Sequence, residues 1–85
     1  MKCIVRVEVR LKKGFHDPEG VTALSCLRDL GFKQIVDVKS GKVYYLTIEA
    51  QTKEDVLKIA EQACTKLLSN PVKDEYNISI IECTE

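Results

Sequence analysis

The longest apolar pattern in the chain lies between Thr52 and Asn70 and has the spacing of an amphipathic helix. Apolar residues recur there at intervals of three and four: Val56, Ala60, Ala63 and Leu67. Thr52 is a good N-cap, because its hydroxyl can accept a hydrogen bond from a free backbone N–H. Pro71 disfavours helical geometry at Asn70. The pattern therefore predicts one long helix that ends at or just before Asn70 and buries its apolar stripe, Leu67 included, against a sheet.

Three other segments alternate apolar and polar residues with the period of two that is typical of half-buried strands: residues 3–11, 43–50 and 76–83. A shorter strand is predicted at residues 35–39. Ser40 and Gly41 between this strand and the next are predicted to form a tight hairpin turn.

A second helix is predicted to start at Asp17, which can cap it, and Pro18, which fits the first helical position. Its apolar stripe consists of Val21, Leu24, Leu27 and Leu30. Gly31 fits the left-handed position after the helix, where Phe32 can pack back on Leu27.

The element order is β-α-β-β-α-β, which predicts a ferredoxin-like α+β fold. Right-handed crossovers would place both helices on one face of a four-stranded antiparallel sheet. Eighty-five residues form a single domain, residues 1–85, with a thin core. Oligomerisation is expected for a domain with so small a core.

The second face of the predicted sheet carries more apolar area than a water-facing surface needs. By alternation it holds Ile4, Arg6, Glu8, Arg10, Ile35, Val43, Tyr45, Thr47, Asn77, Ser79, Ile81 and Cys83. A contiguous apolar patch with a charged rim is typical of a contact surface. We expect this face to pack against another copy of the chain or a partner, with Arg6, Arg10 and Tyr45 as candidate contacts.

Composition and charge argue against a nucleic-acid binder, a membrane protein and a secreted protein. Thirteen basic residues balance thirteen acidic ones, which argues against a nucleic-acid binder, although Tyr45 on a central strand is the kind of residue on which RNA-binding modules stack bases. No apolar run is long enough for a membrane span, and the alternating start of the chain is unlike a signal peptide. The four cysteines form no CxxC pair, so we expect reduced, mostly buried thiols in a cytoplasmic protein.

The chain also lacks the residue patterns of a catalytic site. His16 is the only histidine and stands in a loop with no serine or cysteine placed to face it. Gly41 and Lys42 lie in the predicted hairpin, which is the wrong context for a phosphate loop. From the residues alone, we expect a non-catalytic, oligomeric α+β module that binds no metal.

Three segments resemble the PurS family, the small subunit of phosphoribosylformylglycinamidine (FGAM) synthase. They are VEVRLKKGFHDPEG (7–20), VDVKSGKVYYLTIEA (36–50) and CTKLLSNPVKDEY (64–76), in the family's order and spacing. Ser40 and Lys73 differ from the apolar residues common at those positions. The motif residues to which we give structural roles are Asp17 and Pro18 at the start of the first helix, Gly41 in the hairpin, and Asn70 and Pro71 at the end of the second helix.

The resemblance implies a role in de novo purine biosynthesis. The complex would convert formylglycinamide ribonucleotide, ATP and glutamine to FGAM, as a glutamine-dependent carbon–nitrogen ligase. A PurL-type subunit would use ATP and magnesium, and a PurQ-type glutaminase would release ammonia. The PurS-like chain would be a required but non-catalytic adaptor, a homodimer or higher oligomer that binds no cofactor itself. The alternative is a ferredoxin-like regulatory module that binds an amino acid or nucleotide.

Overall fold

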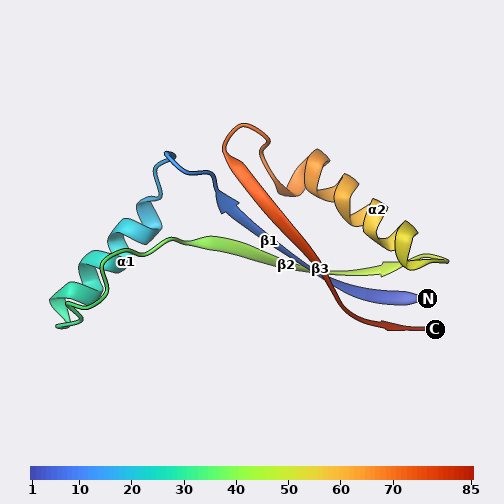
Figure 1. Ribbon diagram of the computed structural model, residues 1–85, viewed down its shortest axis with the longest axis horizontal. Helices are drawn as coiled ribbons and strands as arrows, with labels where there is room; N and C mark the ends of the chain where they lie inside the picture. Colours follow the sequence, from blue (N-terminus) through green and yellow to red (C-terminus); the bar gives the residue numbers. More distant parts are fainter.

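The computed structural model describes all residues 1–85 and contains three strands, two α-helices and one π-helical turn (Figure 1). In chain order these elements are β1 (Lys2–Leu11), α1 (Pro18–Asp29), β2 (Gly41–Glu49), α2 (Lys53–Ala63), η1 (Cys64–Leu68) and β3 (Asp74–Thr84). All five long elements start within two residues of their predicted starts. The predicted strand at residues 35–39 does not form, and these residues belong to an irregular link between α1 and β2.

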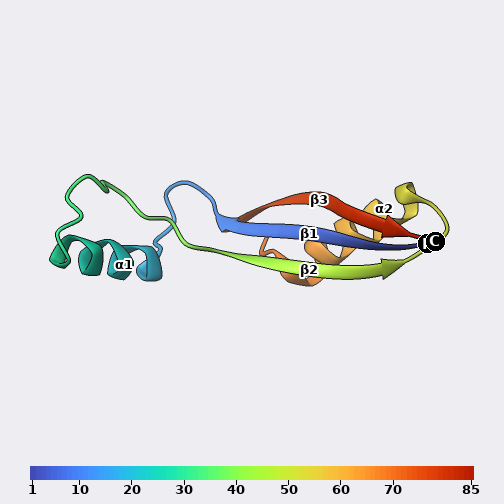
Figure 2. The ribbon, with the colours of Figure 1, turned by 90° about the horizontal axis from the view of Figure 1, so that it is seen from below.

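The sheet has three strands in the order β2-β1-β3, and both outer strands run antiparallel to β1 (Figure 2). This is the arrangement expected of a ferredoxin-like sheet that lacks one edge strand. The prediction of a four-stranded sheet is therefore wrong. Since residues 35–39 pair with nothing, the outer edge of β2 keeps its backbone groups unpaired within the chain.

Only α2 covers the sheet, and α1 lies beyond the end of the strands (Figure 1). The prediction of two helices on one face is therefore wrong. The reason is the clamp between Ser40 and Asp17, which holds the two ends of the segment 18–37 together at the end of the sheet. We call this segment the arm. It gives the molecule extents of 51 × 27 × 14 Å.

The core lies between β1 and the inner side of α2 and η1. Alternate residues of β1 are buried there as predicted, namely Cys3, Val5, Val7 and Val9. Val56 and Ala60 of α2 pack on them with no exposed surface, which confirms that part of the helical stripe. Thr52 caps α2 as predicted, since its Oγ accepts a hydrogen bond from the Asp55 N–H at 3.1 Å.

Leu67 is 83% exposed, so the prediction that it belongs to the buried stripe is wrong. The cause is η1, in which the Ser69 N–H donates to the Cys64 carbonyl oxygen five residues earlier, at 3.0 Å. A π-helical turn holds one more residue than an α-helical turn, so it rotates the following side chains around the axis. Leu68 packs against the core in place of Leu67.

A β-bulge in β3 reverses the faces near the end of the chain. Val5 is opposite Ile80, whereas its neighbour Ile4 is opposite Glu82, so Ile81 is an extra residue. Beyond it the alternation is reversed, and Cys83 lies on the covered face, opposite Cys3. The prediction that Cys83 faces outward is therefore wrong.

Because the bulge places Cys83 opposite Cys3, these two cysteines can form a disulfide bond. Cys3 and Cys83 form a disulfide, so the prediction of four reduced cysteines is wrong for this pair. Cys26 and Cys64 are free thiols, the first exposed and the second buried.

Candidate interaction site

The root of the arm is fixed by one buried carboxylate, that of Asp17. It accepts hydrogen bonds from the Ser40 backbone N–H at 2.7 Å, the Ser40 hydroxyl at 2.6 Å and the Gly20 N–H at 3.0 Å. These bonds, the Ser40 hydroxyl first, lower the pKa of Asp17 to about 2, so it stays ionised. Asp17 and Pro18 thus start α1 as predicted, and Asp17 also ties its start to the link before β2.

Gly20 makes this close approach possible. A Cβ at this position would lie 2.4 Å from the Val38 carbonyl oxygen and 2.7 Å from Asp17 Oδ2. Sequence reasoning gave Gly20 no structural role. The only sequence signal for this glycine was its place in the segment Asp-Pro-Glu-Gly, and that segment by itself indicates only the start of a helix.

Gly41 has a different role from the predicted one. No hairpin exists there, because Gly41 is the first residue of β2 and lies opposite Arg10 of β1. A Cβ on Gly41 would lie 2.9 Å from the Val9 carbonyl oxygen, so this position favours glycine because the neighbouring strand is close.

Asn70 and Pro71 lie in the turn between η1 and β3, and the helical segment ends before them as predicted. The Asn70 side-chain oxygen accepts from the Val72 N–H at 2.9 Å, and the Asn70 N–H donates to the Asp74 carboxylate at 2.9 Å. Asn70 therefore organises the turn through both its side chain and its backbone, which sets where β3 begins.

The uncovered face of the sheet brings two of the three candidate contacts together. Arg6 of β1 lies directly opposite Tyr45 of β2, whose side chain is 63% exposed. Arg10 lies apart from them, at the end of β1 nearest the arm, with its Nη2 3.8 Å from Glu75. Val43 and Ile81, also expected on this face, are exposed. Figure 2 shows this face directly, with α2 behind the sheet.

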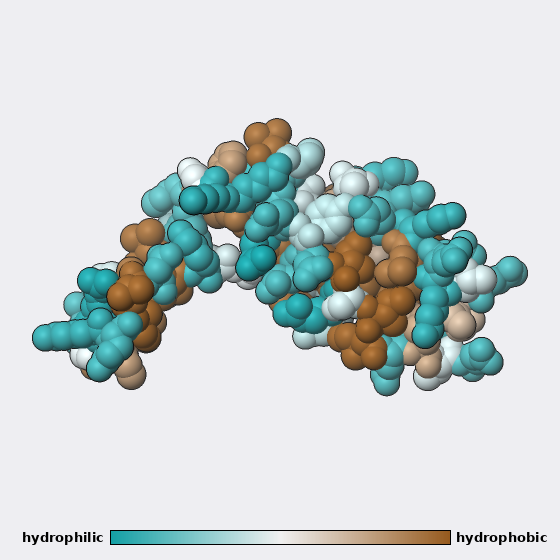
Figure 3. Space-filling view, viewed as in Figure 1, coloured by the Kyte–Doolittle hydropathy of each residue, from teal (hydrophilic) through white to brown (hydrophobic).

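The arm carries a second apolar surface. Val21 is 58% exposed and Leu30 is 74% exposed, and Phe32 and Val36 beyond them are exposed as well. We call the sheet together with α2 and η1 the body. Figure 3 shows apolar surface on the arm, separated by polar atoms from the apolar surface of the body. The end of α1 has the predicted form: the Phe32 N–H donates to the Leu27 carbonyl oxygen at 3.0 Å, and Gly31 is left-handed with φ 97°. The arm is thus a well-formed helix without a cover.

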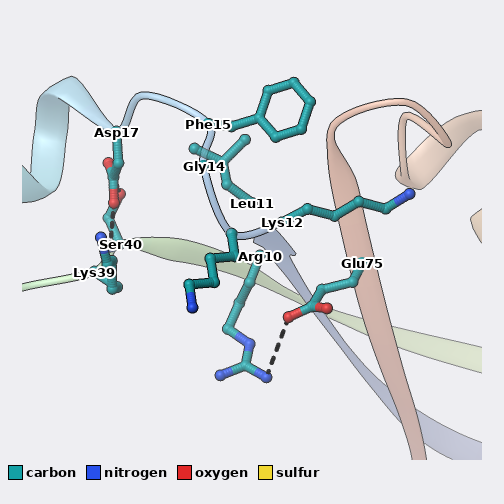
Figure 4. Close-up of a pocket in the computed structure, with 10 residues that line it drawn as sticks. Arg10, Leu11, Lys12, Gly14, Phe15, Asp17, Lys39, Ser40 and Glu75 are labelled. Carbon is teal, nitrogen blue, oxygen red and sulfur yellow. Dashed lines mark hydrogen bonds and ion pairs between the residues drawn. The ribbon is translucent and has the colours of Figure 1, made fainter.

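A polar cleft lies at the root of the arm, bounded by residues 10–15, by the link at 39–40, and by Asp17 and Glu75 (Figure 4). We call it the root cleft. Its volume is about 260 Å³. Its two acids are already engaged, since Asp17 binds Ser40 and Glu75 lies beside Arg10.

The metal-ligating and titratable side chains outside the root cleft do not come together in a site. No three His, Cys, Asp or Glu side chains are placed to hold a metal ion, and His16 is exposed. The Tyr76 hydroxyl donates to Glu61, which raises the pKa of Tyr76 to about 12. Burial raises the pKa of the Cys64 thiol. None of the helices is both long and apolar enough to span a membrane.

Comparison with known proteins gives a consistent match along the chain. The family model described as PurS, phosphoribosylformylglycinamidine (FGAM) synthase, matches residues 4–82. The chain is 43% identical over 75 residues to the PurS subunit of phosphoribosylformylglycinamidine synthase from Archaeoglobus fulgidus, covering 88% of this chain and 94% of that one. It is 33% identical over 78 residues to the corresponding subunit from Bacillus subtilis, covering 92% of each chain.

Solved structures agree with these matches. Methanocaldococcus jannaschii PurS, one of the subunits of formylglycinamide ribonucleotide amidotransferase, superposes with a TM-score of 0.84 at 34% identity, over 99% of this chain and all of that one. A chain of the PurLQS structure from Thermotoga maritima superposes with a TM-score of 0.88 at 30% identity, over 95% of this chain and 99% of that chain.

Proposed function

Since the chain belongs to the PurS family, the small-subunit family of FGAM synthase, we propose that it acts in this synthase as a non-catalytic adaptor between the other subunits. The observation that carries the proposal is the match to a chain of the PurLQS structure from Thermotoga maritima. The synthase is an ATP-dependent and glutamine-dependent ligase, so its chemistry needs two active sites. Ammonia released at one site must reach the other.

The shape of the chain supports an adaptor role. The body is thin, one face of its sheet is bare, and the arm extends past the end of the strands (Figure 1). A part that holds two active sites in register accelerates the transfer between them by proximity, without supplying any reacting group. The partners in this proposal are a PurL-type synthetase subunit, a PurQ-type glutaminase subunit and a second copy of this chain.

The two bare apolar surfaces support the self-association. A small monomer rarely exposes contiguous apolar patches of this kind without using them as contacts. The arm and the uncovered face of the sheet are two such patches on one chain, and Tyr45 lies on the second. In the proposed oligomer, Arg6, Arg10 and Tyr45 contribute contacts from the sheet. The unpaired edge of β2 is available to a neighbouring chain as well.

The proposal leaves cofactor chemistry to the other subunits. ATP and magnesium are used at the PurL-type subunit, and this chain binds no cofactor, nucleic acid or membrane. We place the complex in the cytoplasm, together with the rest of purine biosynthesis.

The test is reconstitution of the synthase with and without this chain. Purified PurL-type and PurQ-type subunits are assayed for FGAM formation with glutamine, and separately with ammonia. We expect glutamine-dependent turnover to require the chain, whereas ammonia-dependent turnover does not, because free ammonia needs no transfer between subunits. Equal glutamine-dependent turnover without the chain would exclude the adaptor role.

A second test addresses the uncovered face. Tyr45→Asp places a charge on this surface and is expected to weaken self-association or complex formation while the chain stays folded. Gln62→Asp adds the same charge to the exposed side of α2 and serves as the matched control. If Tyr45→Asp leaves the mass of the complex unchanged in sedimentation, Tyr45 is not in an interface.

A further inference from the structure

The root cleft concentrates positive charge in a chain whose net charge is zero. Four cationic side chains line it, those of Arg10, Lys12, Lys13 and Lys39, against two carboxylates. They come from the end of β1, the turn after it and the link before β2. The cleft is therefore built by the segments that join the arm to the sheet (Figure 4).

The carboxylates of the cleft do not balance this charge, because two acids stand against four cations. Asp17 stays ionised, but its three hydrogen bonds go to Ser40 and Gly20 at the clamp and it forms no ion pair. Glu75 lies 3.8 Å from Arg10, so it compensates that one cation. Lys12 donates to the Pro71 carbonyl oxygen at 2.8 Å, which leaves its charge uncompensated. Lys13 forms no ion pair.

The remaining cation, Lys39, is only weakly compensated. Its Nζ lies 3.6 Å from the Asp37 carboxylate, but both side chains are mostly exposed, so water and salt screen the attraction. A carboxylate that entered the cleft would meet both Lys13, on the turn after β1, and Lys39, on the link before β2.

An exposed aromatic ring borders the same cleft. Phe15 is 42% exposed and follows the turn in which its N–H closes on the Lys12 carbonyl oxygen at 3.3 Å. Exposed aromatic rings are enriched at protein–protein contacts, in which the ring can be the buried anchor while nearby charges set partner and orientation. The cleft is open, and only two of its ten lining residues are hydrophobic, unlike the enclosed apolar pockets that bind small molecules.

We propose that the root cleft is the docking site for a carboxylate-bearing segment of another subunit of the synthase. This inference rests on the proposed adaptor function and names the chemistry of one of its contacts. Because the cleft is lined by the end of the sheet and by the two segments that lead into the arm, a segment bound there touches the sheet and both connections of the arm. Docking would hold the arm at one angle to the sheet and so fix the position of whatever the arm binds.

The experiment uses the full chain with charge reversals at two lysines of the cleft, Lys13→Glu and Lys39→Glu together. Its affinity for the PurL-type and PurQ-type subunits is measured by calorimetry at two salt concentrations. We expect the Kd for one of these subunits to rise by about tenfold or more, and its salt dependence to weaken. The variant with arginine at both positions should retain wild-type affinity.

The matched control reverses two lysines outside the cleft, Lys53→Glu and Lys66→Glu, which carry the same change in net charge. Circular dichroism of every variant shows whether the fold is kept. If the cleft variant and this control bind equally well, the inference is wrong while the adaptor function stands. If the wild-type chain binds neither subunit, the adaptor function is wrong and the inference falls with it. Binding of inorganic pyrophosphate to the isolated chain that the cleft reversals abolish, with assembly unchanged, would make this a small-anion site and also overturn the inference.

Discussion

Truncation of Val56 to alanine tests how the helical segment covers the sheet. Val56 belongs to α2, has no exposed surface and packs against the buried residues of β1. The change removes two methyl groups from a core of only eight buried apolar residues. Because so few residues form this core, the loss falls on a large fraction of it.

The magnitude follows from three terms. Burial of each methyl group is worth about 0.8 kcal/mol, which gives about 1.6 kcal/mol for two. Space that the neighbours cannot fill adds to this cost. Alanine is the better helix former by roughly 0.5 kcal/mol, which offsets part of the loss. We expect Val56→Ala to lower the free energy of unfolding by about 1.5–2.5 kcal/mol, and Tm by about 4–8 °C for each kcal/mol in a domain of this size.

Leu67→Ala is the matched comparison, because an unbroken helix would bury Leu67 on the same stripe. The structure turns Leu67 outward at η1 and leaves it 83% exposed, so its truncation should cost less than about 0.5 kcal/mol. Both variants are unfolded in urea over a dilution series, since self-association would otherwise add to the apparent stability. A loss for Leu67→Ala as large as that for Val56→Ala would refute the placement of η1.

Three further predictions concern the arm and the disulfide. Gly20→Ala should destabilise the chain by about 1–3 kcal/mol in urea, because its Cβ would lie 2.4 Å from a backbone oxygen; unchanged stability would mean that the link runs farther from α1. The pKa of Asp17 falls from 3.8 to about 2 on folding, so its contribution is complete above pH 3.8 and is lost as the pH falls towards 2. Stability should therefore fall more steeply over this range in the wild type than in Asp17→Asn, and parallel curves would contradict the clamp. Reduction of the Cys3–Cys83 disulfide, which joins residues 80 positions apart, should cost about 4.5 kcal/mol in the wild type and nothing in Cys83→Ser. Four titratable thiols in the unreduced, unfolded chain would show that the bond does not form.

The parts of the fold that sequence predicted correctly are those decided by neighbours along the chain. Alternation in β1 reflects a strand with one buried face, and it identified Cys3, Val5, Val7 and Val9 as core. The caps at Asp17 and Thr52 also depend on hydrogen bonds within three residues. A local pattern is sufficient for such features because it contains every group that takes part.

The predictions that failed depend on partners far away in the chain or on a one-residue irregularity. The segment 35–39 has the composition of a strand, but a strand exists only if another pairs with it. The clamp between Asp17 and Ser40 joins residues 23 positions apart and holds this segment away from the sheet. The bulge at Ile81 and the wide turn of η1 each shift one residue. In the strand this reverses the side on which Cys83 lies, and in the helical segment it rotates Leu67 out of the buried stripe.

The sequence predicted which face of the sheet carries the candidate contacts, but it did not predict which of them lie together. Alternation placed Arg6, Arg10 and Tyr45 on one side of the sheet. Only the register puts Arg6 opposite Tyr45 and Arg10 at the root of the arm. Exposed polar residues of any strand follow the same pattern, so the sequence cannot tell a contact from a solvated surface. It also gave no reason to group Lys13 with Lys39, because no local pattern brings those segments together.

Composition and structure together explain why the chain needs partners. Hydrophobic residues make up 45% of the sequence, yet only 11 of 85 residues are buried. A domain with so many hydrophobic residues would bury far more of them if it were stable as a monomer. Part of the unburied remainder lies on the arm and on the uncovered face of the sheet, and part lies on the outer side of the helical segment, at Leu57, Ile59 and Leu67. Much of the apolar surface that stabilises this subunit must therefore be buried only on assembly, which predicts that the isolated chain at high dilution unfolds at a lower urea concentration than the same chain in its complex.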